Sequence, residues 1–159
     1  MLSSGCYKDD CSYNPTRLTY VNNTIDIVDN FGKAPQIFNG DSMSYKTFGI
    51  YFRLNFLETI DPNDCYWMPD NAPNKIKLFT IYNFNSNYPA NSNITSAFTL
   101  LKKTDEVPGD LTTNYLGKYN YFLLNESPTK DTLQQFIIIS FNSYNDTVSV
   151  DTTRAILLK

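Results

Sequence analysis

The chain has 159 residues, a formal net charge of −3 at pH 7 and no histidine. A chain of this length fits one domain that buries its own core, so folding requires neither a metal nor an oligomer, and we expect a monomer. Nucleic acid and anionic membrane surfaces attract clustered Lys and Arg, whereas the 13 basic residues here are scattered and outnumbered by 16 acidic ones, which excludes both partner classes.

The N-terminal segment contains two of the three cysteines, Cys6 and Cys11, on either side of a short acidic stretch. Structural zinc sites need four Cys or His ligands at short spacings. The chain offers only Cys65 besides these two and has no histidine, so we expect no metal site here.

The residues before Cys6 favour a targeting signal over a metal site. Leu2 and the small residues at 3–5 resemble the end of a bacterial lipobox, where the signal peptide is cut and the cysteine becomes the lipidated N-terminus. Residues 1–5 lack the charged and apolar regions of a complete signal peptide, so we interpret them as a lipobox remnant. More than one acyl chain on Cys6, with about 0.8 kcal/mol for each buried CH₂, would hold the domain durably to a membrane that it does not enter.

The three charged residues after Cys6 sharpen this interpretation. Lys8, Asp9 and Asp10 resemble the export signal that sends lipoproteins of the Bacteroidetes type to the outer face of the outer membrane. The resemblance implies a location at the outer membrane surface. It also divides the chain into a flexible tether over residues 1–15 and a folded domain over residues 16–159.

The two other cysteines have two interpretations. If Cys6 carries lipid, Cys11 and Cys65 remain as a pair that an oxidising compartment would join. In the chain-entropy model a disulfide closing so long a loop stabilises the folded chain by about 4 kcal/mol. The alternative is that both are free thiols, one in a tail and one in a loop.

After residue 15 the residue pattern is typical of β-strands separated by turns. The clearest strand is Tyr45–Leu57, in which apolar residues recur with a period of two and therefore share one face. That face carries Phe48, Ile50, Phe52, Leu54 and Phe56, and the opposite, partly wet face carries Tyr51, Arg53 and Asn55. The other strand candidates are Leu18–Val28, Lys75–Phe84, Lys118–Leu124, Leu133–Phe141 and Thr147–Leu158.

About seven short strands with turn signals between them predict an all-β fold, an antiparallel β-sandwich of immunoglobulin-like size. Lys75–Phe84 is apolar on both faces and is expected to be a central strand. One helical turn is expected at Ile94–Phe98, with Asn93 as its cap.

The long loop 61–74 is the candidate binding site. It contains the only tryptophan, Trp67, next to Tyr66, and an exposed aromatic pair is a good platform for a sugar ring or an apolar side chain. The alternative is that Trp67 folds back and closes one end of the sandwich. Asp61, Asp64 and Asp70 in this loop are interpreted as solvated turn residues. Calcium binding by Asp61, Asn63 and Asp64 is not expected, because the EF-hand pattern is missing.

Several stretches together resemble a known family. Residues 75–84, residues 88–95 with Phe98, residues 44–50 and the closing residues 151–153 are similar to a family of small Bacteroidetes surface lipoproteins whose domain has no assigned function. The resemblance covers nearly the whole chain. It implies an all-β domain on a lipidated tether, and it offers no catalytic residue to transfer.

Enzymatic activity and a cofactor are not expected. Without histidine the chain has no Ser-His-Asp or Cys-His arrangement, and Cys65 has no nearby basic residue in the sequence to lower its pKa. The sequence therefore predicts a non-enzymatic outer-surface lipoprotein domain that binds a glycan or a peptide through Tyr66 and Trp67. The alternative is a structural or accessory component that docks onto another surface protein by a sheet edge.

Overall fold

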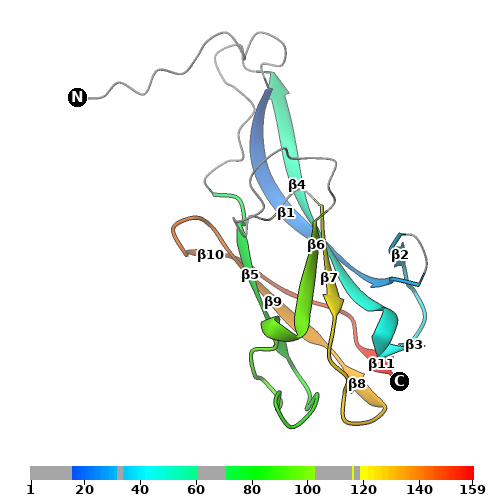
Figure 1. Cartoon of the computed structure of the whole chain (residues 1–159). Helices are drawn as coiled ribbons and strands as arrows, with labels where there is room; N and C mark the ends of the chain where they lie inside the picture. The colour runs from blue at the N-terminus through cyan, green and yellow to red at the C-terminus, as the bar shows by residue number, and fades with distance from the viewer. Residues whose placement is uncertain (1–15, 32–33, 61–70, 103–115, 117–118) are drawn as a thin grey trace.

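A computed structural model of the chain describes residues 16–31, 34–60, 71–102, 116 and 119–159 (Figure 1). These residues form eleven strands and two 3₁₀ turns, and seven of the strands are five residues or longer. The all-β, sandwich-like fold predicted from the sequence is confirmed. No helix among the described residues is long and apolar enough to cross a membrane.

The largest sheet has five strands in the order β2-β1-β4-β7-β6. Its strands are β1 (Thr16–Asp29), β2 (Gln36–Ile37), β4 (Phe48–Ile60), β6 (Phe98–Lys102) and β7 (Tyr119–Leu124). All of its pairings are antiparallel. The β1–β4 ladder is the longest, from Thr16 opposite Ile60 to Asp29 opposite Phe48. At one end of the domain these two strands extend beyond their neighbours (Figure 1).

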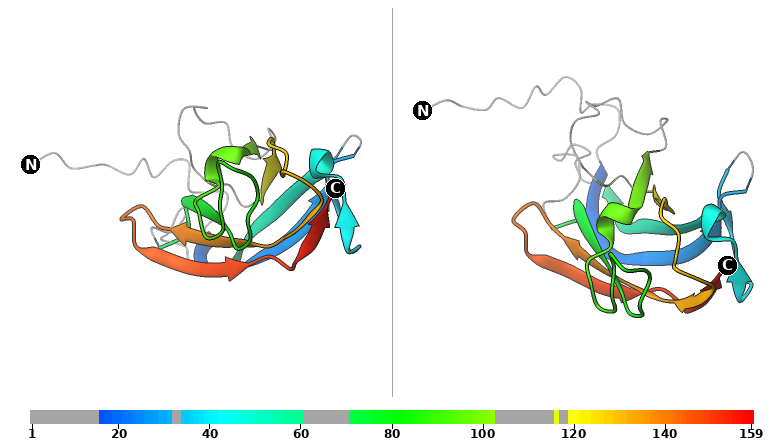
Figure 2. Two further views of the ribbon diagram at one scale, coloured as in Figure 1. Left: turned by 90° about the horizontal axis from the view of Figure 1, so that it is seen from below. Right: turned by 60° about the horizontal axis from the view of Figure 1, so that its bottom comes forward.

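Two three-stranded sheets complete the fold. One has the order β10-β9-β5 and consists of β5 (Lys75–Thr80), β9 (Phe136–Phe141) and β10 (Thr147–Thr152). The other has the order β3-β11-β8 and consists of β3 (Ser42–Met43), β8 (Thr132–Gln134) and β11 (Ile156–Leu158). Its β3–β11 pairing is parallel, and the two strands lie side by side near the C-terminus in Figure 2.

Alternating apolar residues fill the core between the sheets. The inward residues of β4 from Phe48 to Leu54 are at most 1% exposed, as their period of two predicts. Phe136 of β9 packs across the interior with ring centroids 5.5 Å from both Phe48 and Phe98. These aromatic contacts join the five-stranded sheet and the β10-β9-β5 sheet in one core.

Two predicted strands are each broken in two. Leu133–Phe141 is interrupted at Gln135, and Thr147–Leu158 is interrupted after Thr152. The breaks lie together, because the Thr153 backbone N–H donates to the Phe136 carbonyl (2.9 Å) and the Phe136 N–H donates to the Thr153 hydroxyl (3.0 Å). Here both segments pass from one sheet to the other.

Other sequence predictions need adjustment at strand ends. The segment Tyr45–Thr47 is a 3₁₀ turn, η2, and β4 begins only at Phe48. β5 ends at Thr80 and is not central, because β9 lies in the middle of that sheet. The outer edge of β5 is instead bonded by the backbone of residues 91–94. The predicted helical turn exists as the 3₁₀ turn η3 (Thr95–Ala97). Its N-cap residue is Ile94 and not the predicted Asn93, whose side chain accepts from the Thr95 N–H at 2.9 Å.

Candidate functional site: a tyrosine row on the five-stranded sheet

The outer face of the five-stranded sheet carries a group of tyrosines set by strand register. Directly opposite residues of an antiparallel pair lie on the same face, and successive residues alternate. Ile50 opposite Phe122 points into the core, so Tyr51 opposite Tyr121 points outward. Arg53 opposite Tyr119 lies on the same outer face. We call Tyr51, Tyr119 and Tyr121 the tyrosine row.

The three rings of the tyrosine row are stacked. The Tyr51 ring lies 4.9 Å from Tyr121 and 6.4 Å from Tyr119, at interplanar angles of 21° and 15°. The Arg53 guanidinium lies over the Tyr119 ring, 5.6 Å from its centroid. All three tyrosines are part-buried and Arg53 is exposed. Tyrosine faces and edges, hydroxyl groups and one cation are thus gathered on one surface.

The Tyr51 phenol stays protonated at physiological pH. Burial and the neighbouring Tyr121 raise the pKa of the Tyr51 phenol above its ordinary value of 10.0, and Arg53 opposes this. Asp26, directly opposite Tyr51 on β1, also raises the pKa. A phenol with a raised pKa keeps its proton at physiological pH, so its hydroxyl can both donate and accept a hydrogen bond.

The two ends of the tyrosine row differ. On the Arg53 side, the Asn55 amide donates hydrogen bonds of 2.8 Å to both the Asn22 side-chain oxygen and the Thr24 hydroxyl. On the other side Leu123 and Val28 close over Gly49, where an added Cβ would lie 2.8 Å from a Leu123 methyl carbon and 2.9 Å from a Val28 methyl carbon. The row therefore has a polar end and an apolar end.

A second polar cluster joins β1 to β10 on the core-facing side. A β-bulge at Val21 brings Tyr20 and Asn23, three residues apart, to the same face of β1. The Asn23 side chain accepts from the Tyr20 hydroxyl (2.8 Å) and donates to Ser149 (2.6 Å) and Asp151 (3.0 Å). All of these side chains are part-buried and mutually bonded, as expected of a link between sheets.

The site residues predicted from the sequence lie outside the described residues. Those are Cys6, Lys8, Asp9, Asp10 and Cys11 near the N-terminus, and Cys65, Tyr66 and Trp67 in the long loop. Lipidation, the export signal, the disulfide and the aromatic binding pair therefore stay predictions.

The last residues of the 61–74 loop are described and are held by the domain. Ala72 and Pro73 are buried, and the Asn74 N–H donates to the Phe141 carbonyl at 2.9 Å. In the sequence the loop follows β4, the strand that carries Tyr51 and Arg53.

The sequence indicated one half of the tyrosine row. The alternation of β4 placed Tyr51 and Arg53 on a partly wet face, but nothing local connected them with Tyr119 and Tyr121 almost 70 residues later. Among the described residues no three His, Cys, Asp or Glu side chains gather where they could hold a metal ion. What the row offers is non-covalent contact through aromatic, hydroxyl and charged groups.

The fold and this surface define an all-β, sandwich-like domain with an aromatic outer face. No protein-family model matches the chain, and no curated protein or solved structure matches it significantly.

Proposed function

We propose that the chain is a non-enzymatic domain of an outer-surface lipoprotein and that it binds a glycan through the tyrosine row. The observation that carries the binding proposal is the stack of Tyr51, Tyr119 and Tyr121 with Arg53 beside it. The anchor is proposed from the residues around Cys6, and the proposed location is the outer membrane surface.

The chemistry of the row suits a sugar. A sugar ring has C–H faces that pack on aromatic rings and hydroxyl groups that need hydrogen-bond partners. Tyrosine supplies both kinds of contact, and it loses little conformational entropy when it binds. The Asn55 and Asn22 side chains extend the row with amide groups, which also bond sugar hydroxyls. Tyr66 and Trp67 lie outside the described residues, and their binding role stays a separate prediction from the sequence.

Binding to a panel of bacterial and host polysaccharides, by glycan array and then calorimetry, tests this proposal. Tyr51→Ala and Tyr121→Ala should each weaken the best ligand at least about tenfold, which is about 1.4 kcal/mol. Tyr144→Ala is the matched control, because Tyr144 is 69% exposed in the β9–β10 turn and outside the row. Row variants that bind as tightly as the unmodified chain, or no binding to any glycan, would contradict the proposal.

The anchor has a separate test. Mass spectrometry of the native protein extracted from membranes should find acyl chains on Cys6, and the same data should show Cys11 joined to Cys65. A protein that begins at Met1 with three free thiols would rule out both.

The second candidate function is docking onto another surface protein. It is favoured by β10, an end strand of its sheet, on which Val150 is 63% exposed. Exposed edge strands accept partner strands through their free backbone groups. Val150→Lys should abolish a co-purifying partner while leaving glycan binding unchanged. Retention of the partner by this variant would exclude docking by β10.

A further inference from the structure

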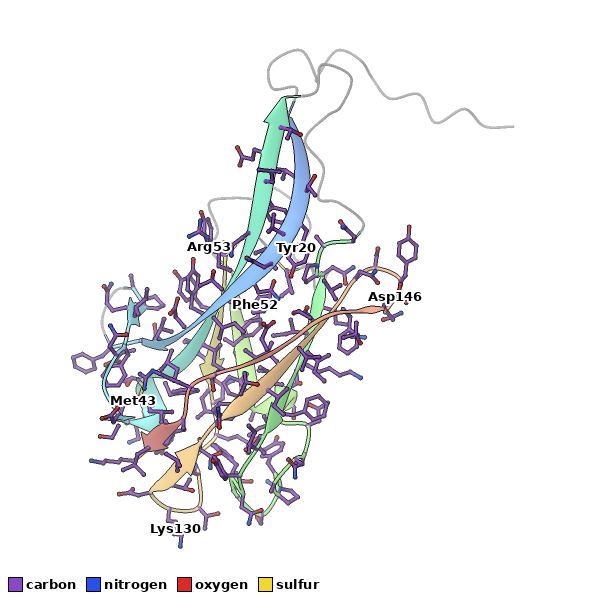
Figure 3. The ribbon with its side chains drawn as sticks, turned by 180° about the vertical axis from the view of Figure 1, so that it is seen from behind. Tyr20, Met43, Phe52, Arg53, Lys130 and Asp146 are labelled. Carbon is purple, nitrogen blue, oxygen red and sulfur yellow. The ribbon has the colours of Figure 1, made fainter. Side chains whose placement is uncertain are left out.

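A cleft of about 430 Å³ lies away from the tyrosine row, between two loops. One wall is formed by residues 82–85, which follow β5. The other is formed by Thr129 and Lys130, just before β8, and by Thr132 and Leu133 within it. Figure 3 shows Lys130, on the second wall, at one end of the domain, whereas β1 begins at the other end and Arg53 lies in between. Clefts of this size hold small ligands.

Hydrogen bonds beneath the cleft fix its two walls to each other. The Thr129 N–H donates to the Phe84 carbonyl at 3.0 Å, and the Gln134 side chain donates to the Asn83 carbonyl at 3.0 Å. Gln134 is fully buried and accepts in turn from the buried Thr80 hydroxyl, also at 3.0 Å. The cleft therefore exists before any ligand arrives, and binding costs little reorganisation.

Several polar groups on the rim of the cleft have no side-chain partner among the described residues. Within the described part of the chain, the Lys130 ammonium forms no ion pair, and neither the Tyr82 hydroxyl nor the Thr129 hydroxyl forms a side-chain hydrogen bond. Asp131, the nearest acid in the sequence, is not among the residues that line the cleft. The rim also exposes apolar surface, since Tyr82 is 39% exposed and Leu133 is 47% exposed.

We propose that this cleft binds a carboxylate-bearing sugar unit, such as a uronic acid. One ammonium matches one carboxylate, whereas phosphate groups are usually held by Arg forks or by several backbone N–H groups. The hydroxyl groups of Tyr82 and Thr129 match sugar hydroxyls, and the Tyr82 ring and Leu133 match the C–H face of the ring. The proposal stands without the tyrosine row, because none of the row residues lines the cleft.

The net charge of the chain shapes how the test must be done. At −3 the chain as a whole repels a polyanion, so only a short acidic ligand will report the local attraction of Lys130. The probe is therefore an oligogalacturonate of three or four units, titrated calorimetrically at low salt. The methyl-esterified form of the same oligomer is the neutral comparison, because it keeps the sugar and removes the charge.

The full chain should bind the acid oligomer at least tenfold more tightly than its ester. Lys130→Gln should weaken the acid oligomer at least tenfold and leave the ester unchanged, and Tyr82→Phe should weaken both several-fold. Lys75→Gln is the matched control, since Lys75 is exposed at the far end of β5 and should leave binding within twofold. Tyr121→Ala, in the tyrosine row, should also have no effect.

Four results would overturn the proposal. The first is no binding of the acid oligomer to the full chain at millimolar concentration. The second is equal binding of acid and ester. The third is equal weakening by Lys130→Gln and Lys75→Gln, which would mean that the oligomer senses only the overall charge. Weakening by Tyr121→Ala alone would place the oligomer on the tyrosine row and would overturn the cleft while supporting the proposed function.

Discussion

The Asn23 side chain is the centre of the link between β1 and β10, so Asn23→Ala should destabilise the fold. The substitution removes three hydrogen bonds, from Tyr20 and to Ser149 and Asp151, one of which involves a carboxylate. A neutral hydrogen bond contributes about 1 kcal/mol net and one to a charged group about 1.5–3 kcal/mol. The cluster is only part-buried, and the hydrogen bond that Ser149 donates to Asp151 at 2.7 Å does not involve Asn23, so we expect a loss of about 2–3 kcal/mol.

Urea denaturation measures this loss as a change in the midpoint at constant slope. Asn87→Ala is the matched control, since Asn87 is exposed and its side chain makes no hydrogen bond among the described residues. The control should change stability by less than about 0.5 kcal/mol. If Asn23→Ala and Asn87→Ala lower the midpoint equally, the cluster does not join the sheets as argued.

Replacing Asn23 by the isosteric Asp tests the contact with Asp151 through charge repulsion. Asn23→Asp puts a second carboxylate beside Asp151, because the Asn23 amide nitrogen that it replaces lies 3.0 Å from an Asp151 carboxylate oxygen. Two carboxylates at this distance repel each other, and protonation of one relieves the repulsion. The variant should therefore be much less stable than the natural chain at pH 7 and should recover part of the difference at pH 4. A deficit that is the same at both pH values would show that Asp151 is not its source.

Three further changes probe other parts of the fold. Burial raises the pKa of Tyr20 and Tyr51 above 10.0, and Asp151 adds to the effect at Tyr20. As the pH rises, the unfolded chain loses these two protons before the folded chain does, so their contribution to stability is complete below pH 10 and falls above it. The difference between the urea midpoints at pH 8 and pH 11 should therefore be smaller in a variant that combines Tyr20→Phe and Tyr51→Phe. Gly49→Ala forces a methyl group against two side chains and a backbone oxygen and should lower stability by about 1–3 kcal/mol in thermal or urea unfolding. Thr153→Val removes the hydroxyl that accepts from the buried Phe136 N–H and should cost about 1–3 kcal/mol in urea, whereas Thr153→Ser should cost less than half of that.

The sequence predicted the fold class because the strongest signal was local. The period-two pattern of β4 is complete within one segment, and its inward residues are buried as the pattern requires. The breaks at Gln135 and after Thr152 could not be predicted in this way, because the cause is a pair of hydrogen bonds between the two segments. A strand that changes sheets keeps its apolar alternation while its partners change.

The candidate sites, too, could be predicted only where they depend on a local sequence pattern. Tyr51 and Arg53 were visible on the wet face of β4, but the stack with Tyr121 depends on the β4–β7 register, which no single segment contains. The cleft depends on loops more than 40 residues apart that only the folded chain brings together. The cysteines and the Tyr66–Trp67 pair are proposals from composition and spacing alone.

The long β1–β4 ladder has a mechanical consequence. β1 enters the fold at Thr16, at the end of the domain opposite the cleft, and runs antiparallel to β4 as far as Asp29 (Figure 1). If the chain is held at a membrane by its N-terminus and pulled by a ligand in the cleft, the force passes along β1. Ladder hydrogen bonds lie perpendicular to the strands, so such a force loads them together in shear and does not peel them apart one by one. The rate of forced unfolding, more than the equilibrium stability, would then decide how long a loaded domain survives.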